Sequence, residues 1–178
     1  MAINYDDALI KAGRESNIDA IRFLLEHGAN VHVRADAALR EATIRGNTEN
    51  VRLLLQYSAD VHAHGDEALR KATMRGNPDI VKLLLEHGAD VHVYDNQPLR
   101  NAILSGNIEC AKLLLNHGAN VHVLDERPLC SAIFKKNIEF ITLLFQYGAD
   151  PTMLPAKEQV KLALLIGDGE GDTKPVRL

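Results

Sequence analysis

The sequence repeats itself every 30 residues. The stretch HGANVHV begins at residue 27, and related stretches begin at 57 (YSADVHA), 87 (HGADVHV), 117 (HGANVHV) and 147 (YGADPTM). Five copies align without a gap as residues 5–34, 35–64, 65–94, 95–124 and 125–154. A unit of this length cannot bury its hydrophobic face alone, so the period predicts a stack in which each repeat covers the next.

The first half of every repeat is predicted to be a helix of about ten residues. A leucine and an alanine recur three residues apart, which places both on one helical face. We expect this helix to begin near an acidic or amide residue that caps its N-terminus, and to end at Gly46, Gly76 or Gly106. The expected capping residues are Asp6, Asp36, Asp66 and Asn96.

A second helix is predicted in the other half of each repeat. An asparagine follows the first helix at once and is a preferred N-cap residue. A glycine at 28, 88, 118 or 148 marks the end of the second helix, where a left-handed residue is common. Ser58 stands at the same place and should cost about 1 kcal/mol relative to glycine if its φ angle is positive. The residues before the glycines, which we expect to bond the last carbonyls, are His27, His87 and His117.

This order of short helix, Gly-Asn turn, second helix, LLxxGAD and extended link resembles the ankyrin repeat, over about residues 5–154. Two features differ from the family. The repeats have 30 residues rather than the usual 33 or so, and they open with DAALR, DEALR, NQPLR and ERPLC in place of TPLH. The missing residues fall at the family's β-hairpin finger, so the resemblance implies an all-α solenoid with shortened hairpin loops. Such 30-residue copies are similar to those of large DNA viruses of amoebae.

The repeats are expected to form one solenoid domain over residues 1–168. Its last part, residues 155–168, reads as a half-repeat cap in which Val160 takes the leucine place and Ala163 the alanine place. A solenoid needs such an end unit to cover its last apolar face. Residues 169–178 are too polar and glycine-rich to fold alone and are predicted to be a disordered tail.

Composition argues against several classes of partner. The net charge of −4 gives no general attraction to nucleic acid. The longest apolar cluster, residues 162–167, is far too short to span a membrane. Cys110 and Cys130 have no metal-binding or redox spacing, so we expect reduced thiols and a cytoplasmic protein, in the host cytoplasm if the source is a virus or a bacterial effector.

The recurring histidines are interpreted as structural. One histidine per link would form a row about 25 to 30 Å long, whereas zinc needs three or four ligands around one point. The alternative role is to bond adjacent loops and make stability depend on pH. The residues are His32, His62, His92 and His122. We find no nucleophile elbow and no Walker or Rossmann glycine pattern, so no enzyme, metal or cofactor is expected.

Two columns of side chains on the first helices are candidate partner contacts. One is an apolar stripe, and the other is a basic column that includes Arg45 and Arg75. Packing between neighbouring helices is the alternative for the stripe. Salt bridges at i,i+4, from Asp36 to Arg40, from Asp66 to Arg70 and from Glu41 to Arg45, are the alternative for the basic column. The predicted partner-binding residues are Ile44, Arg45, Met74, Arg75, Tyr94, Leu104, Leu124 and Phe134.

We therefore predict a non-catalytic scaffold or adaptor that binds another protein along the concave surface of the first helices. The partner segment is expected to be acidic or amphipathic. We expect a monomer. The alternative function is a structural element that stacks through its solenoid ends, because Ile3, Tyr5 and Ile10 would be exposed at the N-terminal end.

Overall fold

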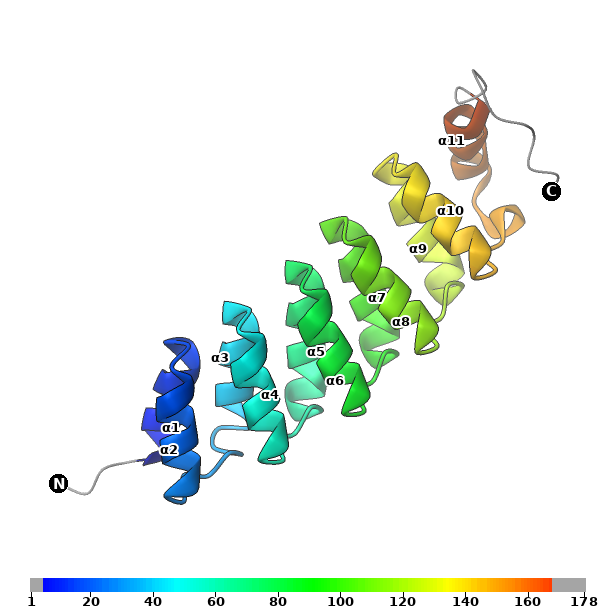
Figure 1. Cartoon of the computed structure of the whole chain (residues 1–178). Coiled ribbons are helices and arrows are strands. Elements are labelled where there is room, and N and C mark those ends of the chain that lie inside the picture. The colour runs from blue at the N-terminus through cyan, green and yellow to red at the C-terminus, as the bar shows by residue number, and fades with distance from the viewer. Residues whose placement is uncertain (1–4, 168–178) are drawn as a thin grey trace.

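The computed structural model describes residues 5–167, with the backbone alone for Asp125, and consists of helical hairpins stacked in one row (Figure 1). The described residues contain no β-strand, which agrees with the predicted all-α fold. The first helices of the repeats are α1 (Tyr5–Arg14), α3 (Ala37–Arg45), α5 (Ala63–Arg75), α7 (Val93–Ser105) and α9 (Val123–Phe134). The second helices are α2 (Ile18–Glu26), α4 (Thr48–Gln56), α6 (Pro78–Glu86), α8 (Ile108–Asn116) and α10 (Ile138–Gln146). A short 3₁₀ helix, η1 (Pro151–Met153), leads to α11 (Ala156–Gly167).

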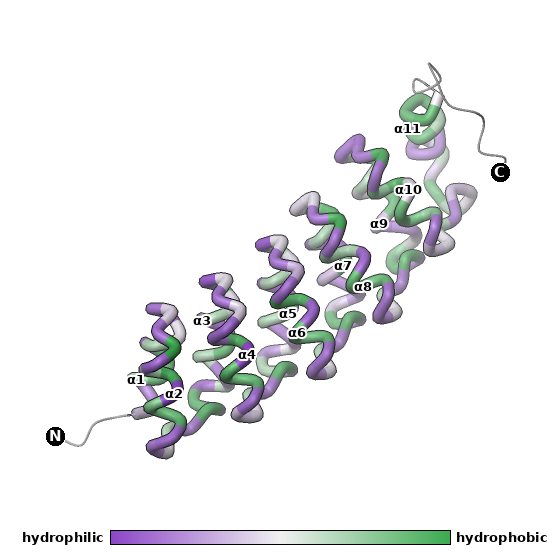
Figure 2. Tube along the Cα trace, viewed as in Figure 1, coloured by the Kyte–Doolittle hydropathy of each residue, from purple (hydrophilic) through white to green (hydrophobic). Residues whose placement is uncertain are grey.

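Each first helix packs on the first helix of the next repeat, and each second helix packs on the next second helix. The core is therefore a continuous layer that runs the length of the row. Figure 2 shows that each hairpin carries both hydrophobic and hydrophilic residues, as this two-sided packing requires. The predicted disordered tail, residues 169–178, lies outside the described residues, as does Ile3.

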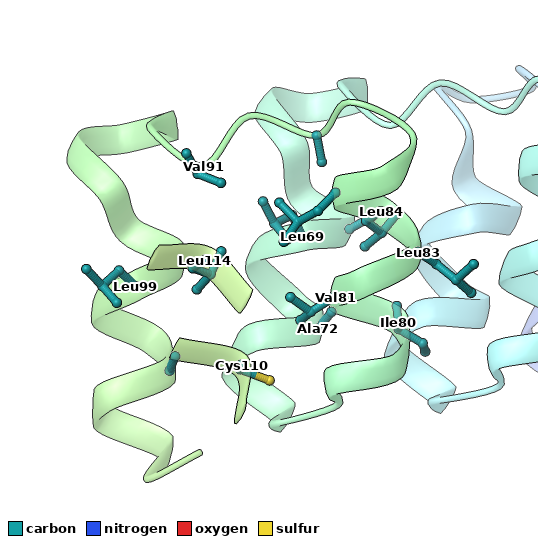
Figure 3. Close-up of a cluster of buried hydrophobic side chains, with 14 of the residues drawn as sticks. Leu69, Ala72, Ile80, Val81, Leu83, Leu84, Val91, Leu99, Cys110 and Leu114 are labelled. Carbon is teal, nitrogen blue, oxygen red and sulfur yellow. The ribbon is translucent and has the colours of Figure 1, made fainter. Parts of the chain in front are cut away.

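The repeated leucine and alanine form the centre of the core, as predicted. Leu69 and Ala72 of α5 are fully buried and lie in one cluster with Val81 and Leu84 of α6 (Figure 3). Leu114 of α8, in the next repeat, belongs to the same buried cluster. Burying a leucine side chain contributes about 1.5 to 3 kcal/mol, so contacts between repeats stabilise helices that are too short to be stable alone.

The predicted asparagine caps of the second helices are confirmed. Each asparagine has extended backbone angles, and its side-chain oxygen accepts the N–H of the residue three places later. This bond satisfies one of the N–H groups that have no partner within the first turn. The five caps are Asn17, Asn47, Asn77, Asn107 and Asn137.

The ends of the second helices also follow the prediction. Gly88 has a φ of 89°, and His87 Nδ1 donates to the Leu83 carbonyl at 2.8 Å. His27 and His117 make the same contact in their own repeats. Ser58 has a φ of 63°, which meets the condition under which the sequence predicts a cost relative to glycine.

The start of the first helices differs from the prediction. Asp36 does not cap α3, because its φ is 56° and its side chain makes no capping bond. It is instead the last of three left-handed residues, 34–36, and residues 64–66 and 94–96 have the same conformation. We call these three segments the left-handed links. They replace the family's finger, and a left-handed residue other than glycine costs about 1 to 2 kcal/mol.

Buried acidic side chains join the links 34–36 and 64–66 to the loop that follows the second helix of the same repeat. Asp66 Oδ1 accepts the backbone N–H of Asp90 at 2.8 Å, and His62 Nδ1 lies 3.2 Å from the same oxygen. Asp36 makes the equivalent contacts with Asp60 and His32. These histidines therefore contact the acid of their own link, and the acid connects adjacent loops. The row predicted from the sequence is structural, but its histidines do not bond adjacent loops directly.

Arginines of the first helices stabilise the left-handed links. Arg70 Nε donates to the Gly65 carbonyl at 3.0 Å, and Arg40 and Arg100 reach carbonyls of their own links in the same way. The predicted i,i+4 salt bridges from Asp36 to Arg40 and from Asp66 to Arg70 do not form, because the acids are turned into the core. The arginine contacts thus offset part of the strain of each link.

The two ends of the solenoid differ from their predicted packing. Ile10 is buried rather than exposed, and Tyr5 is half-buried. At the other end α11 forms as a single capping helix, but its register differs: Leu162 is buried, whereas Val160 is 60% exposed. Leu164 is also largely exposed, so α11 covers α9 on one side and keeps an apolar side uncovered.

Candidate partner-binding surface

The predicted apolar stripe follows the C-terminal halves of four successive first helices. Met74 of α5 and Leu104 of α7 are both 53% exposed, and Phe134 at the end of α9 is 77% exposed. Side chains that filled the contacts between neighbouring helices would be mostly buried, as Ile44 of α3 is in part. The exposed part of the stripe therefore contributes to the surface more than to the core.

Tyr94 and Leu124 extend this apolar surface onto the links. Tyr94 is 58% exposed, and its ring covers Gly65 so closely that a Cβ there would lie 2.9 Å from the tyrosine hydroxyl. The Arg70 guanidinium carbon lies 4.8 Å from the centroid of the same ring. Glycine and arginine contacts thus fix the ring orientation, and the ring presents its remaining surface to solvent.

Three of the predicted residues line one groove near the C-terminal end. Leu104, Leu124 and Phe134 border a hollow of about 510 Å³ between α7, α9 and α11. Met74 and Tyr94 are not part of its lining. The sequence analysis missed the remaining lining residues, which are Arg127, Cys130, Ser131, Pro155, Lys157 and Glu158.

A departure from the repeat pattern marks this groove. Cys130 occupies the register place of Arg40, Arg70 and Arg100, whose side chains fold back over their links. A cysteine is too short to reach the link, so the space that arginine fills in the earlier repeats is open here. The fifth repeat opens with ERPLC, whereas the two repeats before it open with DEALR and NQPLR. This difference was the sequence signal that could have located the groove.

The basic column divides into two classes of side chain. Arg40, Arg70 and Arg100 bond the links and are half-buried. Arg45 and Arg75 are exposed, and among residues 5–167 neither forms an ion pair with a carboxylate. The predicted Glu41 to Arg45 salt bridge does not form, because Glu41 pairs with Arg14 at 3.1 Å. Exposed positive charge therefore flanks the apolar stripe.

The two thiols are poorly suited to nucleophilic chemistry. Burial raises the pKa of Cys110 to about 11, and burial also raises the pKa of the partly exposed Cys130. Each thiol is therefore mainly protonated near neutral pH, and the thiolate is the reactive form. In the described part of the chain, no three His, Cys, Asp or Glu side chains are grouped so that they could hold a metal ion.

A second hollow of about 360 Å³ lies between α8 and α10, on the side of the second helices. Its lining combines Lys112 and Glu139 with Thr142 and Gln146, so it favours neither charge. The groove beside α11 has the more distinct lining, because it combines the apolar Leu104, Leu124 and Phe134 with the cations Arg127 and Lys157.

Between residues 5 and 167, no helix has the length and hydrophobicity needed to cross a bilayer.

Comparison with known proteins agrees with the helical stack. A family model described as ankyrin repeats (3 copies) matches residues 9–95 and, in a second and overlapping match, residues 69–154. None of the curated proteins matches the chain.

Proposed function

The two matches together cover residues 9–154 of 178, so the chain belongs to the ankyrin repeat family, and we propose that it is a scaffold or adaptor that binds a partner protein along the concave surface of its first helices. Ankyrin repeats are generally protein interaction modules and are typically non-catalytic. We infer a reducing, cytoplasmic setting from the two unpaired cysteines. The proposed contacts are Ile44, Arg45, Met74, Arg75, Tyr94, Leu104, Leu124 and Phe134.

The exposure of the stripe is the observation that supports this proposal. Met74, Leu104 and Phe134 recur at one register position on three rigid helices, and each presents more than half of its side chain to solvent. Apolar residues aligned in this way are typical anchors in protein interfaces. Unpaired Arg45 and Arg75 flank them, which adds a preference for negative charge.

Affinity capture from the native cell tests the proposal. The wild type is compared with Met74→Asp and Leu104→Asp, which place a charge on the stripe without changing the core. Ile138→Asp is the matched control, because Ile138 is 50% exposed on α10, on the side of the second helices. We expect both stripe variants to lose a partner that the control retains. Retention of every partner by both stripe variants would reject the proposal.

A second candidate function, end-to-end association with another copy, is favoured by the two solenoid ends. Phe23 of α2 is 53% exposed, whereas Leu53, at the same register place, is buried by the preceding repeat. At the other end α11 exposes Val160, Leu164 and Ile166. Light scattering at micromolar concentration and at a concentration tenfold higher distinguishes the candidates, because a mass that stays monomeric at both rejects this one.

A further inference from the structure

We propose that the groove between α7, α9 and α11 binds an acidic segment of another protein that inserts a large apolar side chain between Leu104, Leu124 and Phe134. This inference rests on the proposed function and adds the chemistry of the partner and the place of its main anchor. Its support comes from the shape of the groove, its charges and the departures from the repeat that produce both.

The groove has the size and the walls that an anchor side chain needs. Its volume of about 510 Å³ lies within the range of roughly 300 to 1,000 Å³ that is usual for ligand pockets. Leu104 lies near the C-terminal end of α7, Leu124 at the start of α9 and Phe134 at the end of α9, and all three are about half exposed or more. An aromatic or long aliphatic side chain inserted into the groove would contact these apolar walls.

The charges at the groove are positive. Arg127 and Lys157 line it, and Lys135 directly follows Phe134 in the chain. Within residues 5–167, none of these three side chains forms an ion pair with a carboxylate. Glu158 is the single acidic residue of the lining, and its Oε1 accepts a hydrogen bond from Lys161 Nζ at 2.9 Å. The net positive lining complements an acidic segment.

The positive charge arises where the repeat pattern changes. In the earlier repeats Arg40 pairs with Glu67, and Arg70 donates to Gln97 Oε1. Arg127 occupies the register place of Glu67 and Gln97, so by register the neighbour of Arg100 is a like charge instead of an acceptor. Like charges at neighbouring positions are unfavourable in the free protein. A bound carboxylate would relieve this repulsion, which favours an acidic partner over a neutral one.

Selection from a peptide library tests the inference and requires no identified partner. A displayed library of random peptides, about 12 residues long, is selected on the immobilised full chain. The enriched peptides are labelled and their affinity is measured by fluorescence anisotropy. Two variants remove one property each: Arg127→Gln restores the acceptor found at Gln97, and Phe134→Ser removes an apolar wall. The matched controls are Lys82→Gln and Ile138→Ser, both exposed on the second helices.

The expected peptides combine Asp or Glu with Phe, Trp or Leu. We expect each groove variant to weaken their binding about tenfold, and the controls to leave it unchanged. Raising NaCl from about 50 to 500 mM should weaken the wild type more than Arg127→Gln. Enrichment of basic or uncharged peptides, no enrichment, or equal losses in the controls would overturn the inference. If capture still depends on the stripe, the proposed function survives that result.

The chain also has an acidic segment of its own, DGEGD at residues 168–172. A full-length variant with Asp168→Asn, Glu170→Gln and Asp172→Asn distinguishes this occupant from a partner protein. We expect its affinity for the enriched peptides to equal that of the wild type. A clear gain in affinity would show that the chain's own segment competes for the groove and would overturn the assignment to another protein.

Discussion

The boundary between the second and third repeats, at the link 64–66, and the boundary between the fourth and fifth repeats, at residues 124–126, have the same register, yet they differ in how many polar groups are satisfied. At the first boundary Arg70 bonds the link and reaches Gln97, and Asp66 holds the next loop. At the second, Cys130 cannot bond the link, and Glu126 is buried with no partner for its Oε2. The closed boundary satisfies its polar groups within the fold, whereas the open boundary leaves the groove that we propose as a binding site for a partner.

The largest expected effect concerns the acids of the two boundaries. Asp66→Ala removes the acceptor of the Asp90 N–H and leaves that group unsatisfied, so we expect a loss of about 3 kcal/mol in the free energy of unfolding. Glu126→Ala removes a carboxylate that bonds His122 through one oxygen and has no hydrogen-bond partner for the other, so the loss in the free energy of unfolding should stay below about 1 kcal/mol. Urea denaturation measures both. Equal losses would mean that the two boundaries do not differ in energy.

Asn50 also departs from the repeat pattern, but its departure opens no groove and lowers stability instead. It is fully buried in α4, and both its amide nitrogen and its amide oxygen lack a partner. The equivalent residue of the next repeat is Ile80, which is equally buried. We expect Asn50→Ile to raise the free energy of unfolding by about 2 kcal/mol, because it removes two unsatisfied polar atoms and adds apolar contact. An unchanged or lower midpoint in urea would indicate that Asn50 has partners in solution.

Cys130→Arg converts the open boundary into a copy of the closed one. The new side chain should fold back to the carbonyl of residue 125, as Arg100 does to the Asp95 carbonyl, and fill part of the groove. We expect peptide affinity to fall about tenfold while stability is unchanged or increased. The measurements are fluorescence anisotropy and urea denaturation. Unchanged affinity in a variant of normal stability would show that the missing arginine does not create the binding site.

The sequence predicted those features that depend on neighbours within one repeat. Asparagine caps, the glycine ends of the second helices and the leucine and alanine of the core each follow from local spacing. The left-handed links were not predicted, because Asp36 and Asp66 are as suited to an N-cap as to the bonds that they make with a loop 24 residues later in their own repeat. The choice between the two roles depends on how the two ends of a repeat meet in space, which the spacing of residues along the chain does not contain.

The candidate site was predicted in part for the same reason. The exposed stripe follows from one register position, so Met74, Leu104 and Phe134 could be identified from the period alone. The groove depends on where α11 packs and on the absence of an arginine at Cys130. An absent side chain has no periodic signal, and the cap does not keep the register of the repeats, because Leu162 rather than Val160 is buried.

The smallest predicted effect measures the cost of one left-handed residue separately from the cost of the packing around it. Ser58 has a φ of 63° at a place where Gly88 has 89°. Ser58 is exposed, so Ser58→Gly removes backbone strain and little packing, and should raise the free energy of unfolding by about 1 kcal/mol. A Cβ on Gly88 would meet no atom within 4 Å, so Gly88→Ser should lower it by a similar amount. Effects of the same sign in the two exchanges would show that packing, rather than the left-handed angle, distinguishes the repeats at this position.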